Sequence, residues 1–209
     1  SVGKIIASKA APKLCPVTLE LGGKNPNIIM SDADLEIAIP GVIDGMRYTR
    51  QGQACTAGSR VYIQEKIFDR VLDGAVEKLS KLKMGNALDE NSDIGAIISE
   101  EQLKRTLYYM DIAKKNSSTK ILHGGNQSKG GEYKDGFYYE PTLLSGLPVS
   151  SPVCQEEVFG PVACAIPFKS FDEVMKSAND TQFGLSAVLW TKDLSRALQF
   201  VDEIEAGFV

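Results

Sequence analysis

The fold is decided by residues 27–46, which read NIIMSDADLEIAIPGVIDGM. Residues 27–30 form a short, largely apolar run that is typical of a strand, and the polar residues 31–34 are of the kind that begin helices. Apolar side chains then recur at helical spacing, at Leu35, Ala38, Ile39, Val42, Ile43 and Met46. Pro40 lies inside this run, where it predicts a kink or a shifted helix boundary. The stretch therefore predicts a strand followed directly by a helix.

Strands and helices continue to alternate on both sides of this stretch. Strands are predicted at residues 60–63, 120–122, 137–144, 162–168 and 186–190, with a further extended run at 17–21. Helices are predicted at residues 2–11, 67–79, 100–115, 171–178 and 194–204. Residues 124–136 are polar and glycine-rich, so they predict an exposed loop or the tip of a hairpin. The alternation predicts the α/β class, with an open, largely parallel sheet covered by helices.

The composition is that of an ordinary globular chain. Hydrophobic residues make up 43% and charged residues 24% of the 209 residues, which gives room for one substantial core, or for one domain and a small piece of another. The formal net charge of -4 gives no electrostatic reason to expect a nucleic acid or an anionic membrane as a partner. No apolar run approaches the ~18 residues that a transmembrane helix needs, and no secretory signal is visible.

The cysteines and the single histidine limit the chemistry. Cys15, Cys55, Cys154 and Cys164 are scattered and form no C-x-x-C pair. This spacing predicts reduced thiols in the cytoplasm, or in the mitochondrial matrix, rather than a disulfide framework. Because His123 is the only histidine, a site built on several histidines is excluded, and no metal centre is expected. His123 precedes two glycines at the end of a short apolar run, where it is predicted to be a turn or strand-end residue.

Both ends of the sequence predict a fragment of a longer protein. The chain begins with Ser1 rather than an initiator methionine, and it enters a helix-like stretch without a capping residue. It stops at Ala206-Gly207-Phe208-Val209, in what is predicted to be the beginning of a strand. A continuation is therefore expected on both sides.

Cys55 stands in an unusually small-residue setting. It lies in the segment QGQACTAGSR (residues 51–60), where glycines and alanines leave space around the thiol. A thiol that attacks a carbonyl needs such space, together with backbone N–H groups that can face the developing oxyanion. Glu20, beside two glycines, could supply a carboxylate that activates water. Spacing alone does not show that Glu20 and Cys55 lie close together. The interpretation of Cys55 as an inert cysteine in a tight turn therefore stays open at this point.

Three signature segments resemble those of the NAD(P)-dependent aldehyde dehydrogenase superfamily. They read LELGGKNP at residues 19–26, GQACTAGSR at 52–60 and EEVFGPV at 156–162. Weaker similarity is found at YEPT (139–142), at NDTQFGL (179–185) and over residues 191–207. The resemblance covers essentially the whole chain in the same order, and it implies the α/β fold of that family's catalytic domain.

The resemblance implies a covalent mechanism and roles for five residues. Cys55 would attack the aldehyde to form a thiohemiacetal, and hydride transfer to NAD or NADP would leave a thioester. Glu20 would activate the water that hydrolyses this thioester to a carboxylic acid, and family branches that pass the acyl group to coenzyme A commonly lack such a base. The carbonyl of Leu21 would contact the nicotinamide amide, Glu157 would bind the nicotinamide ribose, and Phe159 would pack near the nicotinamide ring. The Cys55 N–H would contribute to the oxyanion hole.

The resemblance also implies a division of the chain. Residues 1–22 correspond to the trailing part of a coenzyme-binding domain, and residues 23–209 correspond to a catalytic domain that is truncated at its C-terminal end. Because the main dinucleotide-binding sheet would precede this chain, the chain alone is not expected to act as a dehydrogenase. The implied partner is a small-molecule aldehyde, and the full-length parent is expected to be a homodimer or homotetramer.

The second segment departs from the family pattern at one position. Arg50 stands where the family usually has an asparagine, and Arg47 lies one helical turn earlier. These guanidinium groups are expected to be surface or ion-pairing groups. The alternative is that they bind the distal carboxylate of a semialdehyde.

Two other functions stay open. The first is a hydrolase that uses Cys55 and His123 as a catalytic pair. The second is a non-catalytic binding or assembly module of the same fold, in which Cys55 would react no faster than Cys15. If substitution of His123 abolishes activity and substitution of Glu20 does not, the protein is a hydrolase rather than a dehydrogenase. If Cys55 is alkylated no faster than Cys15, the protein is a non-catalytic module.

Overall fold

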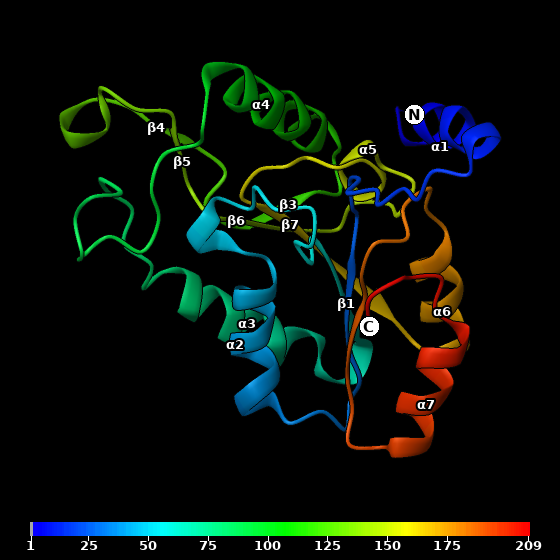
Figure 1. Cartoon of the computed structure of the whole chain (residues 1–209). Coiled ribbons are helices and arrows are strands. Elements are labelled where there is room, and N and C mark those ends of the chain that lie inside the picture. Colours follow the sequence, from blue (N-terminus) through cyan, green and yellow to red (C-terminus); the bar gives the residue numbers. More distant parts are fainter. Residues whose placement is uncertain (1) are drawn as a thin grey trace.

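The computed structural model describes residues 2–209 and contains a six-stranded sheet (Figure 1). Its strands, in spatial order, are β3 (Lys120–His123), β6 (Thr142–Ser145), β7 (Val162–Phe168), β2 (Arg60–Gln64), β1 (Pro26–Ile29) and β8 (Val188–Trp190). β3 and β6 pair in antiparallel fashion, whereas the other neighbours in this sheet pair in parallel. The predicted α/β class and the open, largely parallel sheet are therefore confirmed.

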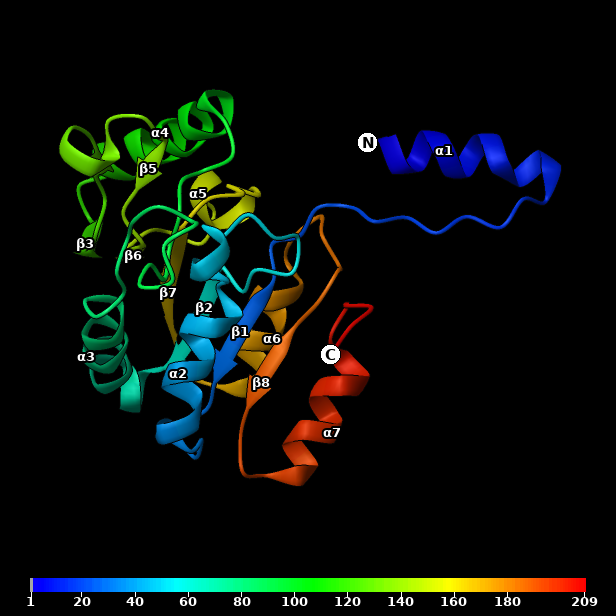
Figure 2. The ribbon, with the colours of Figure 1, turned by 60° about the vertical axis from the view of Figure 1, so that its left-hand side comes forward.

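Helices cover both faces of the sheet (Figure 2). One face carries α2 (Leu35–Gly45) and α3 (Phe68–Leu79), and the other carries α4 (Glu100–Lys115), α5 (Pro152–Gln155), α6 (Phe171–Asn179) and α7 (Leu194–Glu203). Side chains of a strand alternate between the two faces, so Ile28 of β1 joins the core under α4–α7 and Ile29 joins the core under α2 and α3. No helix in the described part of the chain is long and apolar enough to cross a membrane.

The helix that follows β1 begins where the sequence predicts and continues beyond its proline. The Asp34 side chain caps α2 by accepting a hydrogen bond from the Glu36 N–H, at 3.2 Å. The face of α2 that packs on the sheet buries Leu35, Ala38, Val42 and Ile43. The large side chains of Leu35, Val42 and Ile43 each contribute about 1.5–3 kcal/mol on burial, and together they outweigh the ~3 kcal/mol that a proline costs inside a helix. α2 therefore runs through Pro40, and the prediction of a shifted boundary there is wrong.

The other predicted helices and most of the predicted strands are present, with small shifts of their ends. The strand predicted at 137–144 is instead divided between two sheets, with residues 138–139 in a two-stranded sheet and β6 in the main sheet. The predicted loop at 124–136 includes β4 (Gln127–Ser128), which pairs with β5 (Tyr138–Tyr139) as a hairpin. Residues 17–21 form no strand, because no other strand pairs with them. α5 was not expected from the sequence, since a single turn is too short to show an apolar period. Short 3₁₀ turns lie at Ala11–Lys13 (η1), Tyr48–Arg50 (η2), Glu65–Ile67 (η3) and Gly131–Tyr133 (η4).

The N-terminal arm, residues 2–21, lies apart from these layers (Figure 2). It consists of α1 (Val2–Ala10), η1 and an exposed extended stretch, and Leu14, with a φ of 52°, reverses the chain between them. The extended stretch returns along α1, so that a Cβ at Gly3 would lie 2.8 Å from Leu21 Cδ1. A continuous run of buried residues begins at Gly23. The division into residues 1–22 and 23–209 stays a prediction.

Candidate active site

Cys55 follows a tight turn that links α2 to β2. Arg47, Gln51 and Gly52 adopt left-handed backbone, with φ values of 58°, 54° and 64°, a conformation that residues other than glycine rarely take. The Gly52 N–H donates to the Arg47 carbonyl at 2.9 Å and so closes the turn. A side chain at Gly52 would overlap the backbone carbonyl of Gly160. The turn therefore brings the segment of Cys55 against the third signature segment.

The first signature segment packs directly behind the Cys55 main chain. A Cβ at Gly23 would overlap the Cys55 carbonyl oxygen, so only glycine permits this approach. The thiol of Cys55 is free and the residue is half-buried. Among residues 2–209, the Cys55 N–H donates to no protein acceptor. Cys55 thus combines a fixed main chain with an uncommitted N–H group.

Asn25, in the first signature segment, connects the Cys55 loop to the chain just before β8, a role that the sequence did not reveal. Its Nδ2 donates to the Cys55 carbonyl at 2.7 Å and to the Ala57 carbonyl at 3.0 Å. Its Oδ1 accepts from the Ser186 N–H at 3.0 Å. The residue is buried, with 4% of its surface exposed.

Glu157 joins the first and third signature segments. Its Oε1 accepts a hydrogen bond from the Gly23 N–H at 3.0 Å, and a Cβ at Gly22 would lie 2.6 Å from its Oε2. The two glycines of the first segment therefore make room for the Cys55 carbonyl on one side and for the Glu157 carboxylate on the other. Within the described residues, Glu157 Oε2 receives no hydrogen bond from the protein.

The third segment is held by α4, through residues that sequence reasoning missed. Gln102 Nε2 donates to the carbonyls of Val158 and Phe159, at 3.0 and 2.7 Å. The guanidinium group of Arg105 donates to the Glu157 carbonyl at 2.6 Å. The signal that could have found them is their spacing, because polar side chains three residues apart on one helix share a face. Phe159 itself has a φ of 55°, which is unusual for a bulky residue and is stabilised by these contacts.

A tyrosine one turn further along α4 extends this support. The Tyr109 hydroxyl donates to Glu156 Oε2 at 2.7 Å. Burial of the phenol, and then its hydrogen bond to this carboxylate, raise the pKa of Tyr109 to about 12. The hydroxyl therefore remains a donor to Glu156 throughout the neutral range.

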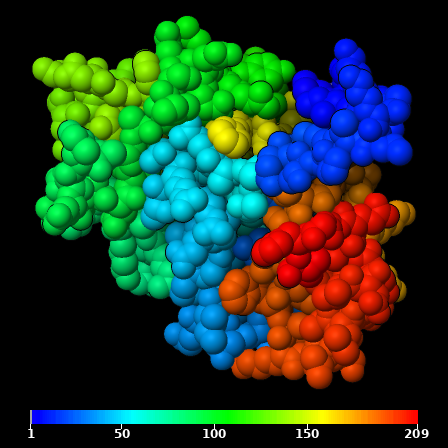
Figure 3. All heavy atoms as spheres, in the orientation of Figure 1, coloured from blue at the N-terminus to red at the C-terminus, as the bar shows by residue number. Residues whose placement is uncertain are grey.

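Glu20 and Leu21 lie on the N-terminal arm, where the structure gives them few contacts. Glu20 is exposed, and its side chain forms no hydrogen bond or ion pair with any described residue. Leu21 is also exposed, and with Gly22 and Phe183 it lines a cleft of about 490 Å³ between the arm and residues 182–185. Figure 3 shows the blue atoms of the arm beside the orange atoms of the later chain. The structure therefore joins Cys55 to the Glu157 segment but does not link Glu20 to Cys55 by any direct interaction.

Two buried cations lie beneath this site. Arg60 is fully buried and donates to the Lys24 and Ala178 carbonyls, each at 2.8 Å, with further bonds to Tyr62 and Ser177. Lys24 is 1% exposed, and its Nζ has no partner within the described structure. Burial lowers the pKa of Lys24 below its usual 10.5. This lysine is a buried structural group rather than a surface charge.

The remaining cysteines have structural surroundings. Cys154 on α5 and Cys164 on β7 are buried, and the hydrogen bond between their thiols, followed by burial, raises the pKa of Cys154. Cys15 is exposed on the N-terminal arm. Cys55 is thus the half-buried thiol of the chain, intermediate between these two environments.

His123 lies at the end of β3, as predicted, and takes no part in the Cys55 site. Its Nδ1 is 2.8 Å from the Pro141 carbonyl, and its ring lines a different cleft, with Met84 and Tyr133. No group of three or more potential metal ligands converges within residues 2–209.

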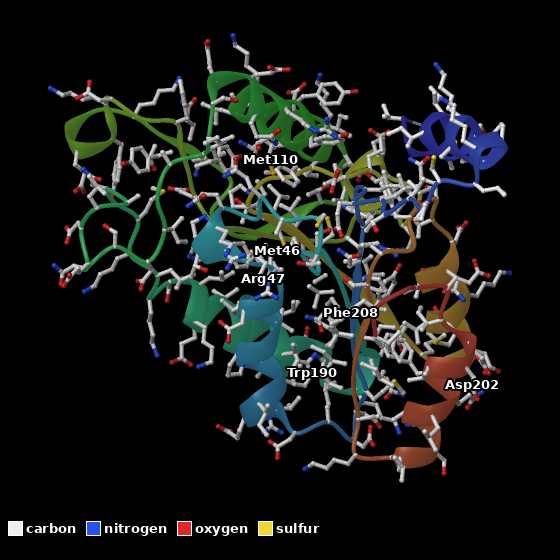
Figure 4. The ribbon with its side chains drawn as sticks, viewed as in Figure 1. Met46, Arg47, Met110, Trp190, Asp202 and Phe208 are labelled. Atoms are coloured by element: carbon white, nitrogen blue, oxygen red, sulfur yellow. The ribbon has the colours of Figure 1, made fainter. Side chains whose placement is uncertain are left out.

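Arg47, just beyond the end of α2 (Figure 4), and Arg50, in the turn that follows, are both exposed. Neither forms an ion pair with a carboxylate among the described residues. Met46, the neighbour of Arg47, is by contrast buried in the core under α2 and α3. The structure therefore places the two guanidinium groups on the surface, as the sequence predicts, without an ion-pair partner.

Comparison with known proteins identifies the family of this site. All 209 residues match the model of the aldehyde dehydrogenase family. The alpha-ketoglutaric semialdehyde dehydrogenase of Bacillus subtilis (strain 168) is 39% identical over 208 residues, which cover 100% of this chain and 42% of that protein. The D-glyceraldehyde dehydrogenase (NADP(+)) of Picrophilus torridus is 38% identical, with 99% of this chain and 41% of that protein covered.

Comparison of the structure with solved structures leads to the same family. The NAD+ complex structure of aldehyde dehydrogenase from Bacillus cereus matches 100% of this chain and 41% of its own, with a TM-score of 0.90 and 36% identity. The chain therefore spans less than half the length of the relatives that it matches. Since the family model and the structural match both extend over the whole chain, the chain belongs to the aldehyde dehydrogenase family.

Proposed function

We propose that this chain carries the catalytic cysteine of an enzyme that oxidises an aldehyde to its carboxylic acid with NAD or NADP. Cys55 is the nucleophile, and Glu20 is the base for hydrolysis of the thioester. Leu21, Glu157 and Phe159 contact the nicotinamide end of the dinucleotide.

One observation carries the proposal. The three segments that surround Cys55 are joined by Gly23, Asn25 and Glu157, and the Cys55 N–H is left without a protein acceptor in the described structure. An uncommitted N–H beside a half-buried thiol is what attack on a carbonyl requires, because negative charge develops on the carbonyl oxygen. A cysteine with a purely structural role would need neither feature.

The chemistry follows from these groups. The Cys55 thiolate attacks the aldehyde carbon, the carbonyl electron pair moves to oxygen, and the Cys55 N–H stabilises that oxyanion. When bound, the dinucleotide supplies the acceptor for the hydride that leaves this carbon as the thioester forms. Glu20 then takes a proton from water, the water oxygen attacks the thioester carbon, and the carbon–sulfur bond breaks. The acid is released, and Cys55 returns to the thiolate.

The residues present fit the nicotinamide end of a dinucleotide. Glu157 is fixed through Oε1 by the Gly23 N–H, while Oε2 receives no protein donor within residues 2–209. A fixed carboxylate oxygen of this kind can accept a hydrogen bond from a ribose hydroxyl. The cleft beside Leu21 and Gly22, of about 490 Å³, lies next to this oxygen because Gly22 contacts Glu157. The named relatives include an NADP enzyme and an NAD+ complex, so the proposal covers both dinucleotides.

The proposal limits what the chain does alone. It spans 41% of the relative with the NAD+ complex, and the parts of that relative beyond this match are expected to complete the dinucleotide site. We expect weak dinucleotide binding and little dehydrogenase activity from these 209 residues, with a homodimeric or homotetrameric parent. Thiol-dependent ester hydrolysis is expected to persist, because it needs Cys55 and water but no hydride acceptor.

The hydrolase that pairs Cys55 with His123 has less support. The His123 ring nitrogen Nδ1 is engaged with the Pro141 carbonyl, and the ring lines a separate cleft. The free N–H at Cys55 also argues against a non-catalytic module. Measuring the rate at which Cys55 is alkylated, relative to Cys15, tests this alternative.

Hydrolysis of p-nitrophenyl acetate tests the proposed function. The unmodified chain is expected to give a burst of p-nitrophenolate equal to one acyl group per chain. Cys55→Ala should abolish the burst, whereas Cys15→Ala, which removes the exposed thiol, and His123→Ala should preserve it. A burst that depends on His123, or one that survives Cys55→Ala, would overturn the proposal.

A further inference from the structure

We propose that Asn25 is a positioning residue that holds the Cys55 main chain so that its N–H can stabilise the oxyanion. This role rests on the proposed function, because it requires Cys55 to be the attacking group. Asn25 acts through the backbone of the nucleophile and touches neither the substrate nor the dinucleotide.

The amide of Asn25 is directed almost entirely at the site. An amide side chain offers two N–H donors and one oxygen acceptor. Both donors are used on carbonyls of the cysteine loop, at Cys55 (2.7 Å) and Ala57 (3.0 Å). The oxygen accepts from the Ser186 N–H at 3.0 Å, which anchors the amide to the chain just before β8. The 4% exposure of Asn25 excludes water as a ready substitute partner.

These bonds fix the loop on the side away from its free N–H groups. The C=O and N–H of a trans peptide point in opposite directions, so turning the Cys55 carbonyl toward Asn25 directs the following N–H, that of Thr56, the other way. The Gly23 main chain lies close to the same carbonyl, because a Cβ there would overlap its oxygen. The Ala54 carbonyl is engaged by the Ala57 N–H at 3.1 Å. The N–H groups of Cys55 and Thr56, which have no protein acceptor among the described residues, are therefore held in place yet free to bind.

Loss of the amide should release this arrangement. A buried carbonyl without a donor costs about 1–3 kcal/mol, so the loop would rotate its carbonyls toward other partners. The free N–H groups would then leave their positions. Because a preorganised oxyanion donor contributes about 10²–10³-fold to the rate, even partial displacement should slow acylation of Cys55.

Asn27 offers a matched control on the same segment. It is 1% exposed, and its Oδ1 accepts from the Trp190 Nε1–H at 2.7 Å. It forms no hydrogen bond to residues 53–57 in the described structure. Asn27→Ala therefore deletes a buried amide without removing a hydrogen bond to the Cys55 loop.

The test compares two reactions of the same thiol in Asn25→Ala, Asn25→Asp and Asn27→Ala. Acylation by p-nitrophenyl acetate passes through an oxyanion, whereas alkylation by iodoacetamide does not. Asn25→Asp keeps the size of the side chain and an acceptor for the Ser186 N–H, but it removes both donors. Both Asn25 variants should slow the acylation burst about tenfold or more while Cys55 is still alkylated at close to its original rate. Asn27→Ala should leave both rates near those of the unmodified chain.

The other outcomes overturn the inference in distinguishable ways. If acylation and alkylation fall together in the Asn25 and Asn27 variants, Asn25 is only a structural residue, and Cys55 remains the nucleophile. If the Asn25 variants acylate at the original rate, the loop does not need the amide. If the unmodified chain shows no acylation of Cys55, the proposed function fails first and the role of Asn25 fails with it.

Discussion

The two proposed catalytic residues lie in regions that are held very differently. Cys55 lies in a junction where Gly23, Asn25 and Glu157 tie three separate segments together by contacts and hydrogen bonds of 2.7 to 3.0 Å. Glu20 lies on the exposed N-terminal arm, where its side chain has no hydrogen bond or ion pair with the described residues. The proposed nucleophile is therefore held in place by this chain, whereas the proposed base is not.

This difference divides the proposed reaction into two halves. Acylation of Cys55 depends on the junction, because the junction fixes the thiol and the free N–H. Deacylation depends on the arm, because Glu20 must reach the water that attacks the thioester. Substitutions in the two regions should therefore change different steps and have different effects on stability.

The largest effect is expected from Glu20→Gln on the arm. The ester burst should persist, and the steady-state turnover after it should fall about 10²–10⁴-fold, which is the usual contribution of a general base. Because the side chain is exposed and unpaired, the free energy of unfolding should change by less than about 0.5 kcal/mol. Stopped-flow absorbance and urea denaturation measure the two quantities. Glu65→Gln, at another exposed glutamate, should change neither, and a lost burst in Glu20→Gln would contradict the division.

The next effect concerns a glycine in each region. Gly23→Ala would place a Cβ on the Cys55 carbonyl oxygen, and such overpacking costs about 1–3 kcal/mol of stability. The burst should also slow, because the Cys55 loop must move. Gly3→Ala on the arm would meet only the end of the flexible Leu21 side chain, so its midpoint in urea should stay near that of the unmodified chain. Equal losses in the two variants would show that the junction is no more rigid than the arm.

A smaller effect is expected at the support from α4. Gln102→Ala removes the donors to the Val158 and Phe159 carbonyls and should destabilise the chain by about 1–3 kcal/mol. Gln199→Ala on α7 removes an exposed bond to Glu203 and should cost less than about 0.5 kcal/mol. Urea denaturation of both variants checks the difference. Similar values for the two would mean that α4 does not hold the third segment.

The smallest effect is the pH dependence that Lys24 imposes on the junction. Burial lowers the pKa of Lys24 in the folded chain below the value of 10.5 that the group has in the unfolded chain. At pH values between the folded and the unfolded pKa, Lys24 is therefore more protonated in the unfolded chain than in the folded chain. Stability should therefore rise with pH across this window. Lys24→Met should remove the rise and add about 1 kcal/mol below the window, because an unpartnered buried donor is lost. Unfolding free energies measured at several pH values test this, and an unchanged slope in the variant would contradict it.

The sequence predicts the layers of this fold because their signals are local. The apolar period of α2 and the apolar run of β1 are visible in the residues themselves, and the structure confirms both. Pro40 misleads because its penalty is local, whereas the burial that outweighs it comes from the sheet. α5 is missed because one turn has no period.

The site was predictable only in part. The resemblance selects Cys55, Glu20, Leu21, Glu157 and Phe159, but their roles stay predictions. The supporting contacts of Asn25 and Gln102 join residues that are 30 to 161 positions apart. The spacing of Gln102 and Arg105 shows that they share a face of α4, but which segments these side chains contact depends on tertiary packing.

Peptide mapping of the trapped acyl group tests the role of the junction most directly. The Glu20→Gln variant, mixed with p-nitrophenyl acetate and quenched in acid, should accumulate a single acetyl thioester. Mass spectrometry should place it on Cys55, with Cys15, Cys154 and Cys164 unmodified. Acetylation of the exposed Cys15 in preference to Cys55, or no stable thioester at all, would contradict the conclusion that this chain by itself preorganises Cys55 for attack.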